Sequence, residues 1–175
     1  MEPLLRIRIF GDPILRERAA EVVDFDAALR RLAEDMRATM LAAAGVGLAA
    51  NQVGVLKRLF TWATATSKGA LVNPEVVDSS EELEEGDEGC LSFPGLYYPT
   101  RRPLRAQLRG YDVHGDPISV EGEGLDARVL LHELDHLNGI LFIDHLARHD
   151  RKDAMRRIRA GELDNPRPQR EAPVA

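Results

Sequence analysis

Two stretches of the chain have the apolar spacing of helices. In the first, from about Asp26 to Ala44, apolar side chains recur every three or four residues, with arginines and acids between them. These apolar positions are Leu29, Leu32, Ala33, Met36 and Met40. The second stretch, from Asp126 to Asn138, is apolar nearly all round, which indicates a helix buried on most of its faces. Its apolar positions are Val129, Leu130, Leu131, Leu134 and Leu137.

Shorter elements complete the predicted fold. Asp12 and Pro13 are suited to the N-cap and first position of a short helix, and Asp150 is suited to cap a last helix that runs to about Ala160. The predicted strands are Lys57 to Ala63, Ala70 to Asn73, Glu75 to Asp78, Arg105 to Tyr111 and Ile118 to Glu121, with a bend at Asn73-Pro74 and a hairpin turn at His114-Gly115-Asp116. The predicted fold class is α+β, with short antiparallel or mixed strands wrapped around a central buried helix.

Length and composition are those of one globular domain. The chain has 175 residues, of which 44% are hydrophobic and 30% charged. We expect one domain over residues 1–160 and a disordered tail over 161–175. No stretch approaches the roughly 20 apolar residues that cross a bilayer, and the N-terminus lacks the features of a secretory signal. The single cysteine excludes an internal disulfide, and these features together favour a cytoplasmic protein that contacts no membrane.

Charge is unevenly distributed along the chain. The formal net charge of −6 argues against general binding of polyanions and against specific recognition of DNA. Residues 78–88 carry seven acidic side chains and no basic one, a pattern typical of a solvated surface. Residues 148–159 instead carry six basic side chains against two acidic ones. The residues that suggest a catalytic function lie in the second helical stretch.

His132 and His136 lie four residues apart in that stretch, with Glu133 between them. On a helix, side chains at this spacing share one face, with Cβ atoms roughly 5–6 Å apart, so two imidazoles can bind one metal ion. Two histidines and a glutamate on an apolar helix are costly to bury unless something compensates them, and a metal satisfies both imidazoles at once. The pattern predicts a metal hydrolase in which the glutamate acts beside the metal.

Spacing does not determine the third metal ligand. Cys90 is the only thiol and binds zinc or iron(II) well, but a small buried hydrophobic cysteine fits the same pattern. His145 lies beyond the end of the helix, and Glu162 lies in the predicted tail, which supports a ligand poorly. Phe142 occupies the position where a longer histidine motif would supply its third ligand. Spacing alone leaves both interpretations of Cys90 open.

Three segments of the chain resemble the signature motifs of peptide deformylases, in the same order. They are Gly45-Val46-Gly47-Leu48-Ala49-Ala50-Asn51-Gln52, Glu88-Gly89-Cys90-Leu91-Ser92 and His132-Glu133-Leu134-Asp135-His136-Leu137. The resemblance runs from Gly11-Asp12-Pro13 to about Asp144. Departures are small: Leu131 stands where many members have glutamine, and Asn51 is at a position that varies. The resemblance implies an enzyme that hydrolyses the formyl group from the N-terminal methionine of new bacterial proteins.

The resemblance also implies roles for individual residues. Cys90, His132 and His136 would hold one divalent ion, with iron(II) expected first and zinc, nickel or cobalt as alternatives. Glu133 would be the general base, while the side-chain amide of Gln52 and the backbone N–H of Leu91 would stabilise the oxyanion. The backbone at Val46 and Gly47 would pair with the substrate, and the methionine pocket would be lined by Val46, Leu125 and Val129. Glu88 and Asp135 are expected to orient ligands or to pair with Arg101 or Arg102.

The implied partners are formylated nascent peptides. Because these emerge from a phosphate-rich ribosome, the basic segment 148–159 is a candidate for ribosome contact. Three other functions remain to be weighed: an endopeptidase with His145 or Glu162 as third ligand, a cysteine hydrolase that pairs Cys90 with His132, and a catalytically inactive binding module. The first predicts cleavage of unformylated peptides and the second predicts tolerance of chelators, while intact catalytic positions argue against the third.

Overall fold

The computed structural model describes residues 4–163 and 171–172, and it has an α+β architecture, which confirms the predicted class. A five-stranded sheet has the order β1-β2-β3-β6-β7, and β4 and β5 form a separate hairpin. All pairings between these strands are antiparallel. The strands are β1 Gly47–Ala49, β2 Leu59–Ala63, β3 Lys68–Ser79, β4 Leu83–Gly89, β5 Tyr97–Pro103, β6 Arg105–Tyr111 and β7 Pro117–Glu123.

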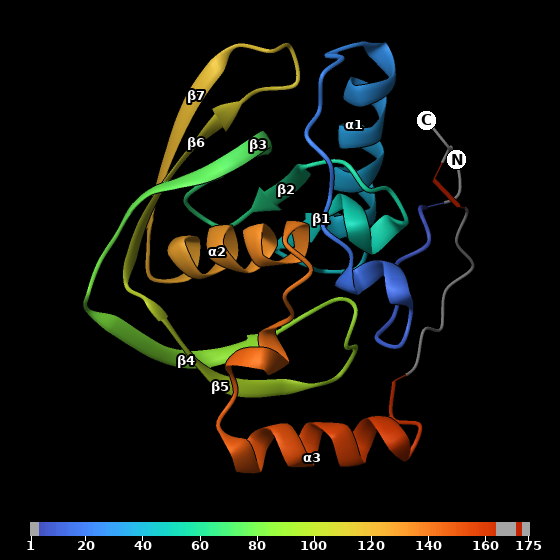
Figure 1. Ribbon diagram of the computed structural model, residues 1–175, viewed down its shortest axis with the longest axis vertical. Coiled ribbons are helices and arrows are strands. Elements are labelled where there is room, and N and C mark those ends of the chain that lie inside the picture. The colour runs from blue at the N-terminus through green and yellow to red at the C-terminus, as the bar shows by residue number, and fades with distance from the viewer. Residues whose placement is uncertain (1–3, 164–170, 173–175) are drawn as a thin grey trace.

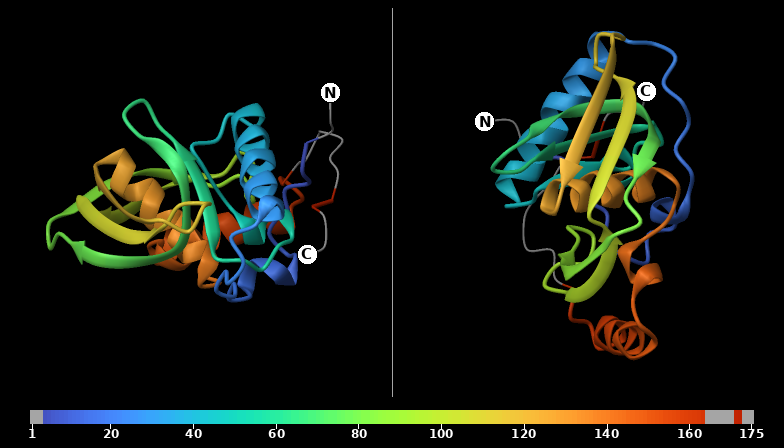
Figure 2. Two further views of the ribbon diagram at one scale, coloured as in Figure 1. Left: turned by 90° about the horizontal axis from the view of Figure 1, so that it is seen from above. Right: turned by 90° about the vertical axis from the view of Figure 1, so that its left-hand side faces the viewer.

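Three α-helices and three short 3-10 helices accompany the strands in the described part of the chain. The α-helices are α1 Ala27–Ala42, α2 Leu125–Leu137 and α3 Arg148–Arg159, and the 3-10 helices are η1 Pro13–Arg16, η2 Ala50–Val53 and η3 Phe142–His145. Helix α2 lies between the large sheet and the β4–β5 hairpin, and α3 lies beyond the hairpin at one end of the molecule (Figures 1 and 2). No described helix has the length and apolar character needed to span a membrane.

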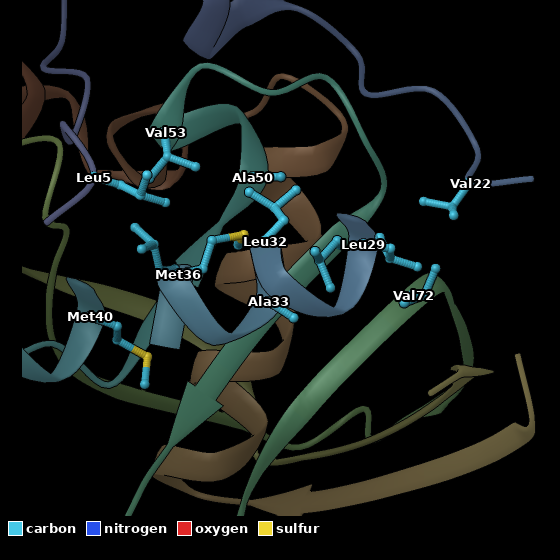
Figure 3. Close-up of a cluster of buried hydrophobic side chains, with 12 residues drawn as sticks. Leu5, Val22, Leu29, Leu32, Ala33, Met36, Met40, Ala50, Val53 and Val72 are labelled. Atoms are coloured by element: carbon cyan, nitrogen blue, oxygen red, sulfur yellow. The ribbon is translucent and has the colours of Figure 1, made fainter. Parts of the chain in front are cut away.

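The two long helices follow from the apolar pattern. The Asp26 side chain accepts a hydrogen bond from Leu29 N at 2.9 Å and so caps α1, and all five predicted apolar positions of this helix are buried. These side chains pack against β1, β2 and β3 in one cluster of the core (Figure 3). A second cluster lies between α2 and the large sheet, and a third joins η1, β5, η3 and α3. Apolar packing therefore buries α2 mainly against the large sheet.

Several local predictions differ from the structure. Strand β3 is continuous where two strands were predicted, because Asn73 adopts a positive φ of 51° and a shift in register absorbs the bend at Pro74. Helix α3 begins at Arg148 after Ala147, so Asp150 lies in its first turn and does not cap it. Asp12 does cap a helix, through Ile14 N at 3.1 Å, but that helix is a single 3-10 turn.

The β4–β5 hairpin was not predicted from the sequence. Most of the acidic run is exposed, as expected, but its last residue, Glu88, is 4% exposed within β4. Glutamate has low strand propensity, so this strand depends on its neighbour. Cross-strand pairing places Glu85 opposite Arg101 and Glu84 opposite Arg102. The arginines of β5 thus neutralise acids of β4. Because the paired residues are far apart in the sequence, the local pattern of residues cannot reveal this pairing.

The expectation of a disordered tail over 161–175 falls mainly on residues 164–170 and 173–175, which lie outside the described residues. Of the rest, residue 171 is in contact with the N-terminal segment. The Glu171 carboxylate forms salt bridges with Arg6 at 2.9 Å and with Arg8 at 2.5 Å. Ala172 packs against the cluster between α1 and the sheet. Two residues near the C-terminus therefore lie against the beginning of the chain.

Arg58 anchors the C-terminal end of α2, so replacing it tests how much these contacts stabilise the fold. Its guanidinium is buried and donates to the Leu137 carbonyl at 3.0 Å and to Asn138 Oδ1 at 2.9 Å. We expect Arg58→Met to lower the free energy of unfolding by about 1.5–3 kcal/mol, the range for a lost hydrogen bond to a charged group. Chemical denaturation of both proteins measures this, and a difference below about 0.5 kcal/mol contradicts the anchoring role.

Candidate metal centre

Three donor atoms converge where the β4–β5 hairpin meets α2. Cys90 directly follows β4, whereas His132 and His136 lie one turn apart on α2. Cys90 Sγ lies 3.3 Å from His136 Nε2, which lies 3.1 Å from His132 Nε2. All three donor atoms are within 4.8 Å of one another. His145 and Glu162 are elsewhere: His145 Nε2 contacts Asp135 at 2.9 Å, and Glu162 pairs with Arg157.

The cluster fits a divalent cation. In a tetrahedral zinc site with Zn–N near 2.0 Å and Zn–S near 2.3 Å, neighbouring donors lie roughly 3.3–3.6 Å apart, close to the separations seen here. One sulfur and two imidazole nitrogens also suit iron(II), cobalt and nickel. Three protein donors leave a coordination position open, which distinguishes a catalytic site from a structural one. The geometry and the chemistry of the donors therefore agree with a catalytic metal.

The surroundings of the cluster shift the pKa values of its two histidines in opposite directions. Burial alone would lower the pKa of His132, but its contacts with Cys90 and Glu88 raise that pKa well above the usual value of 6.5. Burial lowers the pKa of His136 well below 6.5, and the neighbouring His132 lowers it further. A metal ion binds unprotonated imidazole nitrogens, so metal binding competes with protonation of both histidines.

A buried network of charges orients His132. Its Nδ1 lies 2.8 Å from Glu88 Oε2, so the ring donates there and directs Nε2 toward Cys90 and His136. Arg102 donates to both oxygens of Glu88, at 3.0 and 2.6 Å, and to Asp135 at 2.7 Å. Burial alone would raise the pKa of Glu88, but bonds from His132 and Arg102 hold it well below its usual range. Of the two arginines considered from the sequence, Arg102 is therefore the partner of Glu88 and Asp135, whereas Arg101 pairs with Glu85.

Glu133 lies beside the cluster against the start of β1. It is 3% exposed, and its Oε2 is buried without a hydrogen-bond partner among the residues that the structure describes. Burial raises the pKa of Glu133 to about 7. Gly47 is required here, because a Cβ at this position would overlap the Glu133 carboxylate. A buried carboxylate with an unpaired oxygen is an arrangement suited to accepting a proton.

Gln52 is held with its amide group facing Cys90. Ala49 N donates to Gln52 Oε1 at 3.0 Å, which fixes the opposite end of the amide. Gln52 Nε2 therefore lies 3.0 Å from Ser92 Oγ and 3.5 Å from Cys90 Sγ. Sequence analysis missed Ser92, because a serine in a motif carries no signal of which side chain it contacts.

A cavity of about 440 Å³ opens onto these groups. The predicted substrate residues Val46, Gly47, Leu125 and Val129 all line it, together with Gln52, Cys90, Leu91, His132 and Glu133. Val129 is buried, whereas the residues Val46 and Leu125 are 41% and 54% exposed. Arg128 and Tyr97 also line the cavity, although sequence analysis did not single them out. Both lie outside the three motifs, so no local signal marked them.

Comparison with known proteins identifies the family. A sequence model of the family described as polypeptide deformylase matches residues 4–152. A peptide deformylase of Parafrankia sp. is 50% identical over 164 residues, covering 93% of this chain and 90% of that protein. The chain belongs to the peptide deformylase family. The predicted family resemblance is therefore confirmed.

Further relatives support this assignment. A peptide deformylase of Acidothermus cellulolyticus is 53% identical over 156 residues, covering 89% of this chain and 86% of that protein. The crystal structure of peptide deformylase from Thermus thermophilus is 43% identical and has a TM-score of 0.84, covering 90% of this chain and 94% of that one. Peptide deformylases are metal-dependent hydrolases that act on nascent formylated peptides, and this chain has that activity.

The candidate donor set is tested by removing the thiol. Cys90→Ser replaces a soft donor with a weak hydroxyl, so we expect the protein to lose bound metal at least about tenfold faster than wild type. Elemental analysis after dialysis against a chelator measures the metal that remains. Ser92→Ala is a matched control, since it alters a neighbouring hydroxyl outside the donor set. Equal metal retention in Cys90→Ser and wild type would show that the thiol is not a ligand.

Proposed function

We propose that Cys90, His132 and His136 hold one divalent cation, iron(II) in the native protein, and that this centre hydrolyses the N-formyl group of nascent chains. The observation that carries the proposal is the convergence of these three donors within 4.8 Å at a cavity that Glu133 also lines. When bound, the cation supplies a Lewis acid that lowers the pKa of water toward neutrality. Helix α2 is buried at the centre of the fold and presents both imidazoles of this centre on one face.

Glu133 is the general base in this proposal. Its buried Oε2 has no hydrogen-bond partner in the described part of the chain, so it is available to take a proton from water in the cavity and to pass it to the leaving amine. Gly47 has no Cβ, and this leaves room for the Glu133 carboxylate. Glu133 is not one of the three donors, so base and ligands are separate groups that can be altered independently.

Gln52 and Leu91 stabilise the oxyanion that develops on the formyl group. The hydrogen bond from Ala49 N to Gln52 Oε1 keeps the donor end of the amide near Cys90. The backbone N–H of Leu91 follows Cys90 directly and is the second donor. Preorganised donors of this kind contribute about 2.7–4 kcal/mol each to transition-state stabilisation.

The peptide binds along β1. This strand is at the end of the strand order, so one of its edges is not paired within the sheet. Backbone groups at Val46 and Gly47 add the extended substrate to that edge, as in other cases of strand addition. Leu125 and Val129 provide the apolar lining for the methionine side chain. Because nascent formylated chains are made in the cytoplasm, we place the activity there.

The proposed reaction is tested by formate release. We expect the purified enzyme to release formate from formyl-Met peptides, to lose this activity with a chelator, and to regain it with iron(II) or cobalt(II). The same peptides without the formyl group serve as the control and should remain uncleaved. Cleavage of internal bonds would instead support an endopeptidase, and activity that survives the chelator but not thiol alkylation would support a cysteine hydrolase.

Replacing Glu133 separates the base from the metal ligands. We expect Glu133→Ala to lower kcat by at least about 10²-fold, within the usual contribution of a general base, while metal content stays that of wild type. Formate release and elemental analysis on the same preparation measure both quantities. Glu84→Ala, at an exposed acid of β4, is a control that should retain full activity. Near-normal turnover in the metal-loaded Glu133 variant contradicts the assignment.

We further propose that α3 brings the enzyme to the ribosome. Its exposed cations are Arg148, Arg151, Lys152, Arg156 and Arg159. Reversal of Arg148, Lys152 and Arg159 to glutamate should abolish co-sedimentation with ribosomes, and added salt should weaken the wild-type association. Catalysis on a free formyl-Met peptide should be unchanged in this variant. Binding that resists both salt and charge reversal excludes this role.

A further inference from the structure

Arg128 is a buried cation for which the proposed chemistry has no role. It lies in the first turn of α2, one turn before His132, and its side chain is 7% exposed. Its Nη1 donates to Glu88 Oε1 at 3.0 Å and to the Thr100 carbonyl at 2.8 Å. Its Nη2 donates to the Glu84 carbonyl at 3.0 Å. One side chain of α2 thus binds the main chain of both β4 and β5.

This attachment matters because the three metal donors belong to two elements. Cys90 follows β4, whereas His132 and His136 belong to α2. The helix fixes the two imidazoles relative to each other, but it does not fix the sulfur. The position of the sulfur depends on how the β4–β5 hairpin is seated on α2. Contacts across that junction therefore decide whether the donors converge.

Besides the bond between His132 and Glu88, arginines attach the hairpin to α2 at two separate points. Arg102 of β5 reaches Asp135, in the last turns of the helix, at 2.7 Å. Arg128 reaches the hairpin from the first turn of the helix. Without Arg128, the described side-chain bonds between the hairpin and α2 would come only from His132 and Asp135, in the later part of the helix, and the end of the hairpin near the first turn of α2 would be free to shift. Arg102 does not replace Arg128, because its bonds to Glu88 join two strands of the same hairpin.

Arg128 also fixes the carboxylate that orients His132. Glu88 Oε1 accepts from Arg128 and from Arg102 Nε, each at 3.0 Å, and Oε2 accepts from Arg102 Nη2. These bonds hold the plane of the carboxylate, so that Oε2 faces His132 Nδ1. Groups that orient metal-ligating histidines in this way typically change metal affinity about 10–100-fold when removed.

We propose that Arg128 is a positioning residue of the metal centre, which it organises by locking the hairpin that carries Cys90 and Glu88 onto the helix that carries the histidines. The inference rests on the proposed metal site. It goes further, because it assigns the geometry of that site to a residue that contacts none of the three donors in the bonds described above.

The test compares metal binding in Arg128→Met, Arg128→Lys and Arg58→Met. Arg58 is a matched control, because it is an equally buried arginine that also binds α2 but bonds to the helix end and not to the hairpin. Cobalt(II) is the probe: competition with a chelator gives its affinity, and its absorption bands report thiolate and imidazole coordination. Thermal unfolding of each protein without metal gives the stability change.

We expect Arg128→Met to bind cobalt(II) about 10–100-fold more weakly than wild type, with weakened thiolate-to-cobalt absorption. The cobalt(II) affinity of Arg128→Lys should lie between those of wild type and Arg128→Met. The lysine ammonium keeps the charge, but it lacks the planar guanidinium geometry that bonds to three acceptors at once. Arg58→Met should lose stability and keep wild-type affinity and spectrum. If Arg128→Met does not fold, Arg128→Lys decides the question.

Two failures can be told apart. If the Arg128 variants keep the affinity and the spectrum of wild type while unfolding at lower temperature, Arg128 is a structural residue alone and the inference is overturned. If wild type itself binds no cobalt(II), or binds it equally well without Cys90, the proposed metal centre is what fails.

Discussion

The site depends on one buried carboxylate, that of Glu88, which joins the β4–β5 hairpin to helix α2. It accepts hydrogen bonds from Arg102, Arg128 and His132, so donors from both β5 and α2 meet on it. A buried charge is costly unless it is paired and hydrogen-bonded, and removing one partner leaves the others unsatisfied. This makes the contact strongly directional: the hairpin and the helix satisfy their charges only in one relative position.

That position is also the one at which sulfur and imidazole nitrogens converge. Apolar packing brings the elements near each other, since one core cluster lies between α2 and the large sheet and another lies on the side of β5 and η3. Such packing is not directional and would tolerate small shifts of the hairpin. The charged bonds supply the direction. In this way a fold held together mainly by apolar burial positions the proposed metal ligands, which require accuracy of a fraction of an ångström.

Much of the fold was predictable because its signals are local. Helix α1 was found from its apolar spacing, and the β6–β7 hairpin from strand formers on either side of a glycine turn. The β4–β5 hairpin escaped prediction, because β4 is rich in glutamates, which favour a strand only when the arginines of β5 lie opposite. At the site, His132 and His136 were identified together since their four-residue spacing defines one helical face. Arg128 was not, because its partners Glu84 and Thr100 are distant along the chain.

The sequence alone determined the family, the pair of histidines and the identity of the candidate base, because each is encoded in a short motif or a helical spacing. Only the tertiary structure decided that Cys90 lies beside the histidines and that Arg102, not Arg101, pairs with Glu88. Only the fold could place Gly47 against Glu133. The physical reason is that these contacts join residues more than ten positions apart, whose proximity is set by how strands pair and how the core packs. Local sequence pattern fixes which residues share a face, and the packing of distant elements fixes which faces meet.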